Sequence, residues 1–260
     1  MPRPGIYSAR FLVVALGIGA LAFGPGASAA LSAPHPSAWG ATPAPSSIAL
    51  SNNPRVSYWA YPQAGAIVRA APSVYARAVG RLRFLTADGL GQAQIYTASR
   101  QERVPKTGVL WTDISLPQRP NGITGWVRAS ALGPLRVVYG LLVVDRTRLR
   151  ATLYNRNGHA IWSAPIGIGR QSLPTPAGHF YVLEKLRAIG GVTYGPFAFG
   201  TSAYAPTLTD WPGGGVVGIH GTNQPQLIPG HPSHGCIRLR NSDITTLWHL
   251  LKIGTSVEIR

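Results

Sequence analysis

The chain has 260 residues, a formal net charge of +16 and a sequence pI near 11.0. Lys and Arg outnumber Asp and Glu by 24 to 8, which favours an anionic partner such as a nucleic acid, a membrane surface or an acidic wall polymer. Because the basic residues are scattered along the chain and no reader motif occurs, a nucleic-acid-binding protein is disfavoured.

The first residues have the three parts of a secretory signal. Arg3 and Arg10 precede an apolar run over Phe11–Phe23, and Ala27-Ser28-Ala29 forms an A-x-A cleavage site. We therefore expect a signal peptide over residues 1–29 and an exported protein, located in the cell wall or another extracytoplasmic space. The alternative is an uncleaved anchor, which would be the chain's one contact with a membrane.

Two further regions precede the C-terminal half. Residues 30–54 are rich in Ala, Pro and Ser and predict a semi-extended linker. Residues 55–134 hold short β-type runs between turns, including the turn signal Asn121-Gly122, and predict a small all-β domain. This region resembles bacterial SH3-like domains in its Gly125-Trp126-Val127 segment, and that resemblance implies a small β-barrel. Trp111 and Trp126 are predicted as core aromatics, with a face that binds wall peptide or glycan as the alternative.

Residues 135–260 predict a second, mostly β domain. "RVVYGLLVVD" reads as a buried strand, Asn157-Gly158 as the turn of a hairpin, and "GGGVVGIHGT" as a strand that ends near His220. The stretch "NSDITTLWHLLKIG" has helical spacing, with Asn241 or Ser242 as its N-cap. "TSVEIR" closes the chain as a strand.

Cys236 is the only cysteine, so in an exported chain it has no internal disulfide partner. His220, His231 and His234 are candidate bases that could take a proton from its thiol. Gly235 would allow the backbone to approach a substrate closely. A zinc site built from these histidines and the cysteine is an alternative, although the spacing matches no common zinc pattern. A buried cysteine near surface histidines is another.

"HG" at residues 220–221 followed by "SHGCIRL" at 233–239 resembles the signature of the L,D-transpeptidase (YkuD-like) catalytic domain, supported by "IGIG" and by "LPTPAGHFYV" over Leu173–Val182. The resemblance implies a β-rich catalytic domain with a short helix after the cysteine, so the expected fold class is mainly β throughout. It implies that Cys236 is the nucleophile and His220 the general base, and that the Gly221 carbonyl orients the imidazole.

The same resemblance assigns supporting roles to neighbouring residues. His234 would support the thiolate or its geometry, while Gly235 and Cys236 would supply backbone N–H groups to an oxyanion. Ser233 would brace the loop and Arg238 would lie next to the substrate. Tyr194 either lines the acyl-donor channel or packs in the core. His231 lies outside the pattern and is expected to be a loop histidine.

The implied reaction is acyl transfer from a peptidoglycan tetrapeptide stem, with loss of D-Ala, to an amine of a neighbouring stem, which gives a 3→3 cross-link. No metal and no cofactor is required, and the expected partners are stem peptides and anionic wall polymers. Three alternatives stay open: an L,D-carboxypeptidase, attachment of a protein to the wall by the same acyl-enzyme, and a non-catalytic wall-binding protein.

Overall fold

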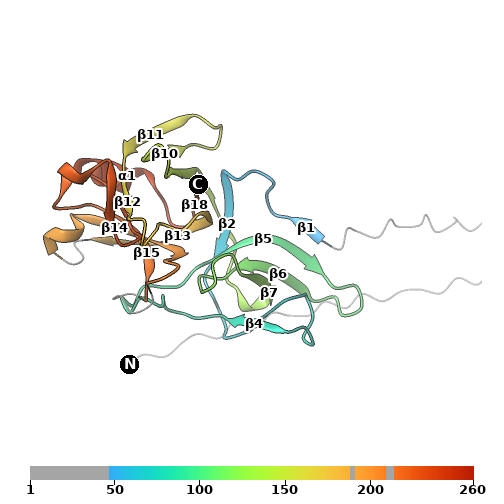
Figure 1. The fold of residues 1–260 in the computed structure, drawn as a ribbon. Coiled ribbons are helices and arrows are strands. Elements are labelled where there is room, and N and C mark those ends of the chain that lie inside the picture. The colour runs from blue at the N-terminus through green and yellow to red at the C-terminus, as the bar shows by residue number, and fades with distance from the viewer. Residues whose placement is uncertain (1–46, 188–190, 209–213) are drawn as a thin grey trace, which may run out of the picture. The chain divides into compact units, whose positions relative to one another are not determined.

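The computed structural model of the protein describes residues 47–187, 191–208 and 214–260. The predicted signal peptide and the linker residues 30–46 lie outside the described residues. The described chain is mainly β, with one α-helix (Figure 1). No helix among the described residues is long and apolar enough to cross a membrane.

The first sheet is antiparallel and has the strand order β4-β3-β7-β6-β5-β2-β8, with β1 paired to β5. Its strands are β1 (Ser47–Ala49), β2 (Val56–Ala60), β3 (Ile67–Arg69), β4 (Ala78–Arg81), β5 (Tyr96–Arg103), β6 (Leu110–Ser115), β7 (Thr124–Arg128) and β8 (Arg136–Tyr139). Trp111 and Trp126 are buried in β6 and β7, as predicted. Strand β1 lies within residues 30–54, which the sequence predicted as a linker. Its residues are part of the first sheet, because they pair with Arg100, Gln101 and Glu102 of β5.

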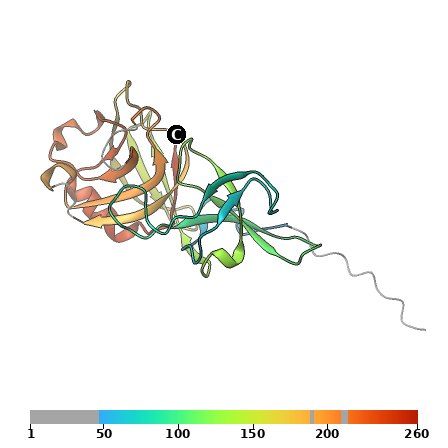
Figure 2. The ribbon, with the colours of Figure 1, turned by 90° about the horizontal axis from the view of Figure 1, so that it is seen from below.

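The second sheet has the order β11-β10-β9-β18-β13-β14-β15-β17-β12-β16. Its strands are coloured from yellow-green to red in Figure 1 and Figure 2. Its strands are β9 (Leu141–Asp145), β10 (Arg150–Tyr154), β11 (Ala160–Pro165), β12 (Gly167–Gly169), β13 (Gly178–Arg187), β14 (Phe197–Tyr204), β15 (Val216–His220), β16 (Gly230–Ser233), β17 (Ile237–Arg238) and β18 (Ser256–Ile259). Short 3-10 turns cover Ala129–Ala131, Gly191–Tyr194 and Pro225–Leu227. The predicted hairpin at Asn157-Gly158 joins β10 to β11, and the predicted last strand is β18.

The sequence predicts that the run "RVVYGLLVVD" forms one strand, and this prediction is wrong. The run forms two strands, β8 and β9. Gly140 has φ +130° and separates β8, which pairs with β2 of the first sheet, from β9 of the second. That conformation lies in the region that favours glycine, so the chain changes sheets there without a long connection. The boundary between the two sheets therefore falls at Gly140.

Helix α1 (Asn241–Leu250) follows the cysteine, as the spacing predicted, and buries Ile244, Leu247 and Trp248. The Trp248 ring stacks on Phe197 of β14, with ring centroids 4.5 Å apart. The predicted capping is wrong: the N-cap is Arg240, and no side chain caps the helix. Asn241 is already the first helical residue, and its Oδ1 accepts a hydrogen bond from the Thr222 N–H at 3.0 Å.

Each sheet has its own hydrophobic cluster, and a third cluster contains residues of both. That third cluster includes Trp59, Ile95 and Val138 from the first part of the chain and Tyr181 and Leu183 from β13. Tyr181 also donates from its hydroxyl to the Ile95 and Ser115 carbonyls, each at 3.3 Å. Burial of these aromatic and aliphatic side chains stabilises the contact between the two sheets.

Candidate active site

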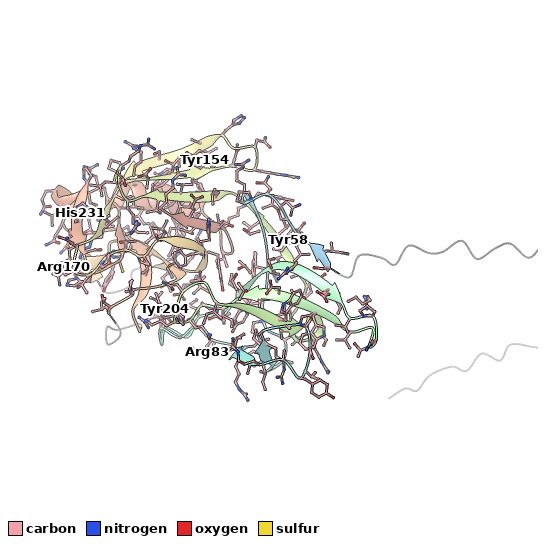
Figure 3. The ribbon with its side chains drawn as sticks, turned by 45° about the vertical axis from the view of Figure 1, so that its right-hand side comes forward. Tyr58, Arg83, Tyr154, Arg170, Tyr204 and His231 are labelled. Atoms are coloured by element: carbon pink, nitrogen blue, oxygen red, sulfur yellow. The ribbon has the colours of Figure 1, made fainter. Side chains whose placement is uncertain are left out.

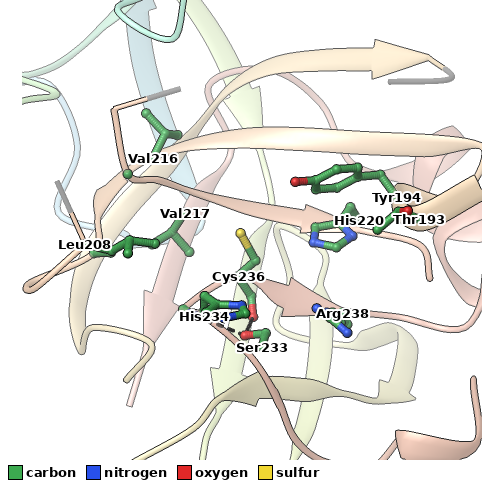
Figure 4. A pocket seen from close by; sticks show the side chains of 13 residues that line it. Thr193, Tyr194, Leu208, Val216, Val217, His220, Ser233, His234, Cys236 and Arg238 are labelled. Carbon is green, nitrogen blue, oxygen red and sulfur yellow. Dashed lines mark hydrogen bonds between the residues drawn. The ribbon is translucent and has the colours of Figure 1, made fainter. Parts of the chain in front are cut away.

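Parallel pairing of β15 and β17 brings the predicted base and nucleophile together. Ile219 lies opposite Ile237, and His220 lies opposite Arg238. Cys236 immediately precedes β17, so its side chain meets the end of β15, where the Gly218 N–H donates to the Cys236 Sγ at 3.4 Å. Figure 4 shows the sulfur and the His220 ring in the same pocket. The fold thus joins two motifs that are separated by a loop in the sequence.

The pocket has a volume of about 150 Å³. It is lined by Thr193, Tyr194, Ala205, Leu208, Gly215, Val216, Val217, His220, Ser233, His234, Gly235, Cys236 and Arg238. Every predicted site residue except Gly221 is in this lining, and Gly221 lies directly behind His220. His231 is exposed and does not line the pocket (Figure 3), in agreement with its expected place outside the motif.

The His220 imidazole is oriented by backbone and held neutral. Its Nδ1 lies 2.6 Å from the Gly221 carbonyl oxygen, and since a carbonyl only accepts, Nδ1 carries the proton. Nε2 is then the lone-pair nitrogen. The Tyr194 ring packs against the imidazole with centroids 4.7 Å apart. Burial is the main cause that lowers the pKa of His220 to about 4; the hydrogen bond to Gly221 opposes this shift, and the positive charge of Arg238 adds to it. At neutral pH His220 is therefore able to accept a proton.

The Cys236 side chain is held as a thiol. Burial raises its pKa, while the Gly218 N–H and the positive charge of Arg238 act in the opposite direction. A raised thiol pKa beside a lowered imidazole pKa disfavours a resting thiolate–imidazolium pair. The arrangement suits general-base catalysis, in which the proton moves to His220 as the sulfur attacks.

A buried hydroxyl network fixes the turn that carries the nucleophile. Ser233 Oγ donates to the Cys236 carbonyl at 2.6 Å and accepts from the Gly235 N–H at 3.1 Å. Thr175 Oγ1 donates to the Gly235 carbonyl at 2.8 Å and accepts from the Gly169 N–H at 2.9 Å. Gly235 has φ +122°, a conformation that favours glycine. Ser233 thus bonds both the Gly235 N–H and the Cys236 carbonyl, and this bond occupies the Gly235 N–H that was expected to face an oxyanion.

Two basic residues complete the polar side of the pocket. Arg238 Nη1 donates to Gln224 Oε1 at 3.1 Å, and its charge is a cause of the lowered pKa of both His220 and His234. Partial burial is the main cause of the lowered pKa of His234, and the charge of Arg170 adds to it.

Among the described residues, no group of three or more His, Cys, Asp or Glu side chains is placed to hold a metal ion.

Sequence reasoning missed two groups of residues around this pocket. Asn241 was predicted as a helix cap, yet its side chain bonds the turn that follows His220. Arg119 and Asn121 lie in the loop between β6 and β7, yet they donate to the carbonyls of Ala205, which lines the pocket, and of its neighbour Tyr204. A motif scan finds residues that are neighbours in sequence, and these contacts join segments far apart in the chain.

The comparisons with known proteins agree on one family. A family model described as the L,D-transpeptidase catalytic domain matches residues 140–259. The putative L,D-transpeptidase YkuD of Bacillus subtilis is 36% identical over 127 residues, covering 48% of this chain and 68% of that protein. The probable L,D-transpeptidase YbiS of Escherichia coli is 31% identical over 134 residues, covering 45% of this chain and 43% of that protein.

Among solved structures, the catalytic domain of the L,D-transpeptidase from E. faecium is 25% identical, with a TM-score of 0.35. The match covers 46% of this chain and 96% of that one. Of the two relatives named above, the chain spans about two thirds of the length of YkuD and less than half of the length of YbiS. On the sequence match to YkuD and to the family model, the chain belongs to the L,D-transpeptidase family and is an enzyme of that type.

Proposed function

We propose that this protein is an exported peptidoglycan L,D-transpeptidase with Cys236 as nucleophile and His220 as general base. The observation that carries the proposal is the contact of 2.6 Å between His220 Nδ1 and the Gly221 carbonyl. It leaves His220 Nε2 unprotonated in the pocket that also holds Cys236, the only cysteine of the chain. This is the tautomer that a base beside a protonated nucleophile requires.

Acylation follows from this arrangement. The Cys236 sulfur attacks the carbonyl of the stem residue before the terminal D-Ala, and the thiol proton passes to His220 Nε2. A carbon–sulfur bond forms, and the oxygen of the tetrahedral intermediate carries the charge until the carbon–nitrogen bond to D-Ala breaks. The departing amine takes the proton from His220. The Cys236 N–H is the backbone donor proposed for the oxyanion, since the Gly235 N–H is bonded to Ser233.

The second half reverses the proton transfers. An amine of a neighbouring stem attacks the thioester, its proton passes to His220, and the Cys236 thiol is restored as the new amide forms. Arg238, at the pocket wall, suits a carboxylate of a stem peptide because a guanidinium binds carboxylates through paired N–H groups. Tyr194 lines the pocket and packs on the His220 ring, which supports a role for it in the acyl-donor channel. His234 supports the geometry of the nucleophile turn.

The remaining assignments concern the rest of the chain. We assign residues 1–29 to a signal peptide, 30–46 to a linker, 47–139 to an SH3-like domain and 140–260 to the catalytic domain. The limits predicted from the sequence move because β1 and β8, expected in the linker and in the catalytic domain, pair with strands of the first sheet. Buried Trp111 and Trp126 on paired strands support the SH3-like assignment. A formal net charge of +16 supports concentration of the enzyme at anionic wall polymers outside the cytoplasm.

Incubation with a disaccharide-tetrapeptide, followed by mass spectrometry of the products, tests the proposal. Cross-linked dimer with loss of D-Ala is expected from the native protein, and no product from Cys236→Ala or His220→Ala. Tripeptide alone would reassign the enzyme as an L,D-carboxypeptidase. A native protein that forms no Cys236-dependent product would contradict the catalytic role and leave a wall-binding protein.

A further inference from the structure

We infer that the loop between β6 and β7 of the first sheet is part of the acyl-donor site, with Arg119 and Asn121 as positioning residues that hold one wall of the Cys236 pocket. The inference rests on the proposed function, since it takes the pocket as the site that is acylated. Both residues lie outside residues 140–259, the region that the family model matches.

The Arg119 guanidinium contacts residues 205–208 and 214, which are described parts of the connection between β14 and β15. Its Nη1 donates to the Gly214 carbonyl at 2.8 Å, and its Nη2 donates to the Ala205 and Leu208 carbonyls at 3.2 and 2.8 Å. All three acceptors belong to the connection between β14 and β15. Hydrogen bonds from a charged donor are stronger than neutral ones, and a rigid guanidinium can reach several acceptors that a lysine ammonium cannot reach together.

Asn121 secures the start of the same connection. Its Nδ2 donates to the Tyr204 carbonyl at 2.8 Å, and its Oδ1 accepts from the Tyr204 N–H at 2.9 Å. Tyr204, labelled in Figure 3, is the last residue of β14, and the Arg119 guanidinium lies over its ring, 4.8 Å from the centroid. A side-chain amide that pairs with both groups of one peptide residue fixes that residue as a strand neighbour would.

The described ends of this connection, residues 205–208 and 214–215, line the pocket and lie against the nucleophile turn. Ala205, Leu208 and Gly215 are all in the pocket lining, and the Ala205 N–H donates to the Gly215 carbonyl at 2.8 Å. A Cβ placed on Gly235 would lie 3.6 Å from the Ala205 Cβ, so the wall lies against the turn that presents Cys236. Loss of the Arg119 contacts would therefore displace the surface against which a bound stem peptide packs.

The space around Gly215 shows how closely the guanidinium fits. Gly215 has φ +78°, and a Cβ at this position would collide with Arg119 Nη2 and with the Leu208 carbonyl oxygen. A larger residue could not occupy this position without moving the arginine.

The test compares Arg119→Ala, Arg119→Lys and Asn121→Ala with the native protein in the tetrapeptide assay. The matched control is Arg136→Ala, which removes another first-sheet guanidinium that lies over aromatic rings, 5.4 Å from the Trp59 and Tyr61 centroids. We expect Arg119→Ala to raise KM for the donor by on the order of tenfold or more, because misplacement of a binding wall costs at least this much. Arg119→Lys should restore little of the loss, and Arg136→Ala should match the native protein.

Two readouts separate positioning from a general loss of structure. The pH dependence of Cys236 alkylation by iodoacetamide should be unchanged in Arg119→Ala, because the Gly218 and Gly221 contacts remain. Hydrogen exchange at the Ala205 amide should accelerate, while exchange across β13 should not. Native KM and native exchange at Ala205 in both alanine variants would overturn the inference, as would a shifted alkylation profile. Failure of the native protein itself to use the donor would instead contradict the proposed function.

Discussion

Burial and a backbone hydrogen bond together determine the pH range over which the His220 imidazole is neutral. Burial disfavours the imidazolium and lowers the pKa to about 4, while the Gly221 carbonyl selects the tautomer with Nε2 unprotonated. The ordinary imidazole pKa of 6.5 would leave much of the base protonated in mildly acidic surroundings. Here the base stays neutral well into that range.

The acid limb of the pH–rate profile follows from this pKa. We predict that kcat/KM for the tetrapeptide falls on acidification with an apparent pKa near 4, because protonated His220 cannot accept the thiol proton. The measurement is kcat/KM from pH 3.5 to pH 8, with circular dichroism to confirm that the protein stays folded. An acid limb centred near 6.5 in a folded protein would contradict a buried neutral base.

At the scale of elements, the first residue of helix α1 supports the turn that follows His220 at the end of β15. Asn241 Oδ1 holds the Thr222 N–H, and Thr222 is 2% exposed, so that N–H has little access to water. Asn241 also packs against Gly221 and Gly195, since a Cβ on either glycine would collide with Asn241 Oδ1. The helix therefore fixes the turn whose carbonyl orients His220.

We predict that Asn241→Ala lowers the free energy of unfolding by about 1 kcal/mol, the net value of a typical hydrogen bond, and also lowers kcat. Ser242→Ala is the control, because Ser242 is the exposed next residue of the helix and does not cap it. Urea denaturation and steady-state kinetics provide the two values. A cost in Ser242→Ala equal to that in Asn241→Ala would favour the capping role that the sequence suggested.

Local patterns predicted the elements, and only the folded chain revealed the contacts between them. The turn at Asn157-Gly158 and the helix with Ile244, Leu247 and Trp248 on one face were readable because their signals are short-range. The family signature predicted Cys236 and His220 as nucleophile and base for the same reason, because each lies in a short motif. The bonds of Arg119 to the pocket wall have no such signal, because they depend on how two sheets meet.

At the scale of the whole molecule, a pair of carboxyl groups joins the two sheets. Glu184 of β13 is buried, and Asp88 from the loop after β4 lies beside it. Burial, together with the hydrogen bond to Asp88 and its charge, raises the pKa of Glu184 to about 9. Asp88 accepts hydrogen bonds from Thr86 Oγ1 at 2.8 Å and from the Leu90 N–H at 3.0 Å. At neutral pH the pair therefore shares one proton and one negative charge.

The raised pKa of Glu184 makes the stability of the folded protein decrease as the pH rises. A carboxyl whose pKa is raised on folding contributes stability that is fully present below its unfolded value of 4.5 and is lost as pH rises through about 9. We predict that Tm falls between about pH 5 and pH 9, and that Glu184→Gln, which keeps a donor toward Asp88, flattens the decline. Glu258→Gln is the control, since Glu258 lies on the terminal strand β18. Equal slopes in all three proteins would contradict the shared proton.

Intact-protein mass spectrometry during single turnover with the disaccharide-tetrapeptide tests the central claim most directly. The account predicts an adduct on Cys236 with the mass of the donor less D-Ala, formed rapidly in the native protein and absent in Cys236→Ala. It also predicts no adduct in His220→Ala at neutral pH, although iodoacetamide still labels that variant at alkaline pH. Acylation of His220→Ala at the native rate, or an adduct on any other residue, would contradict the account.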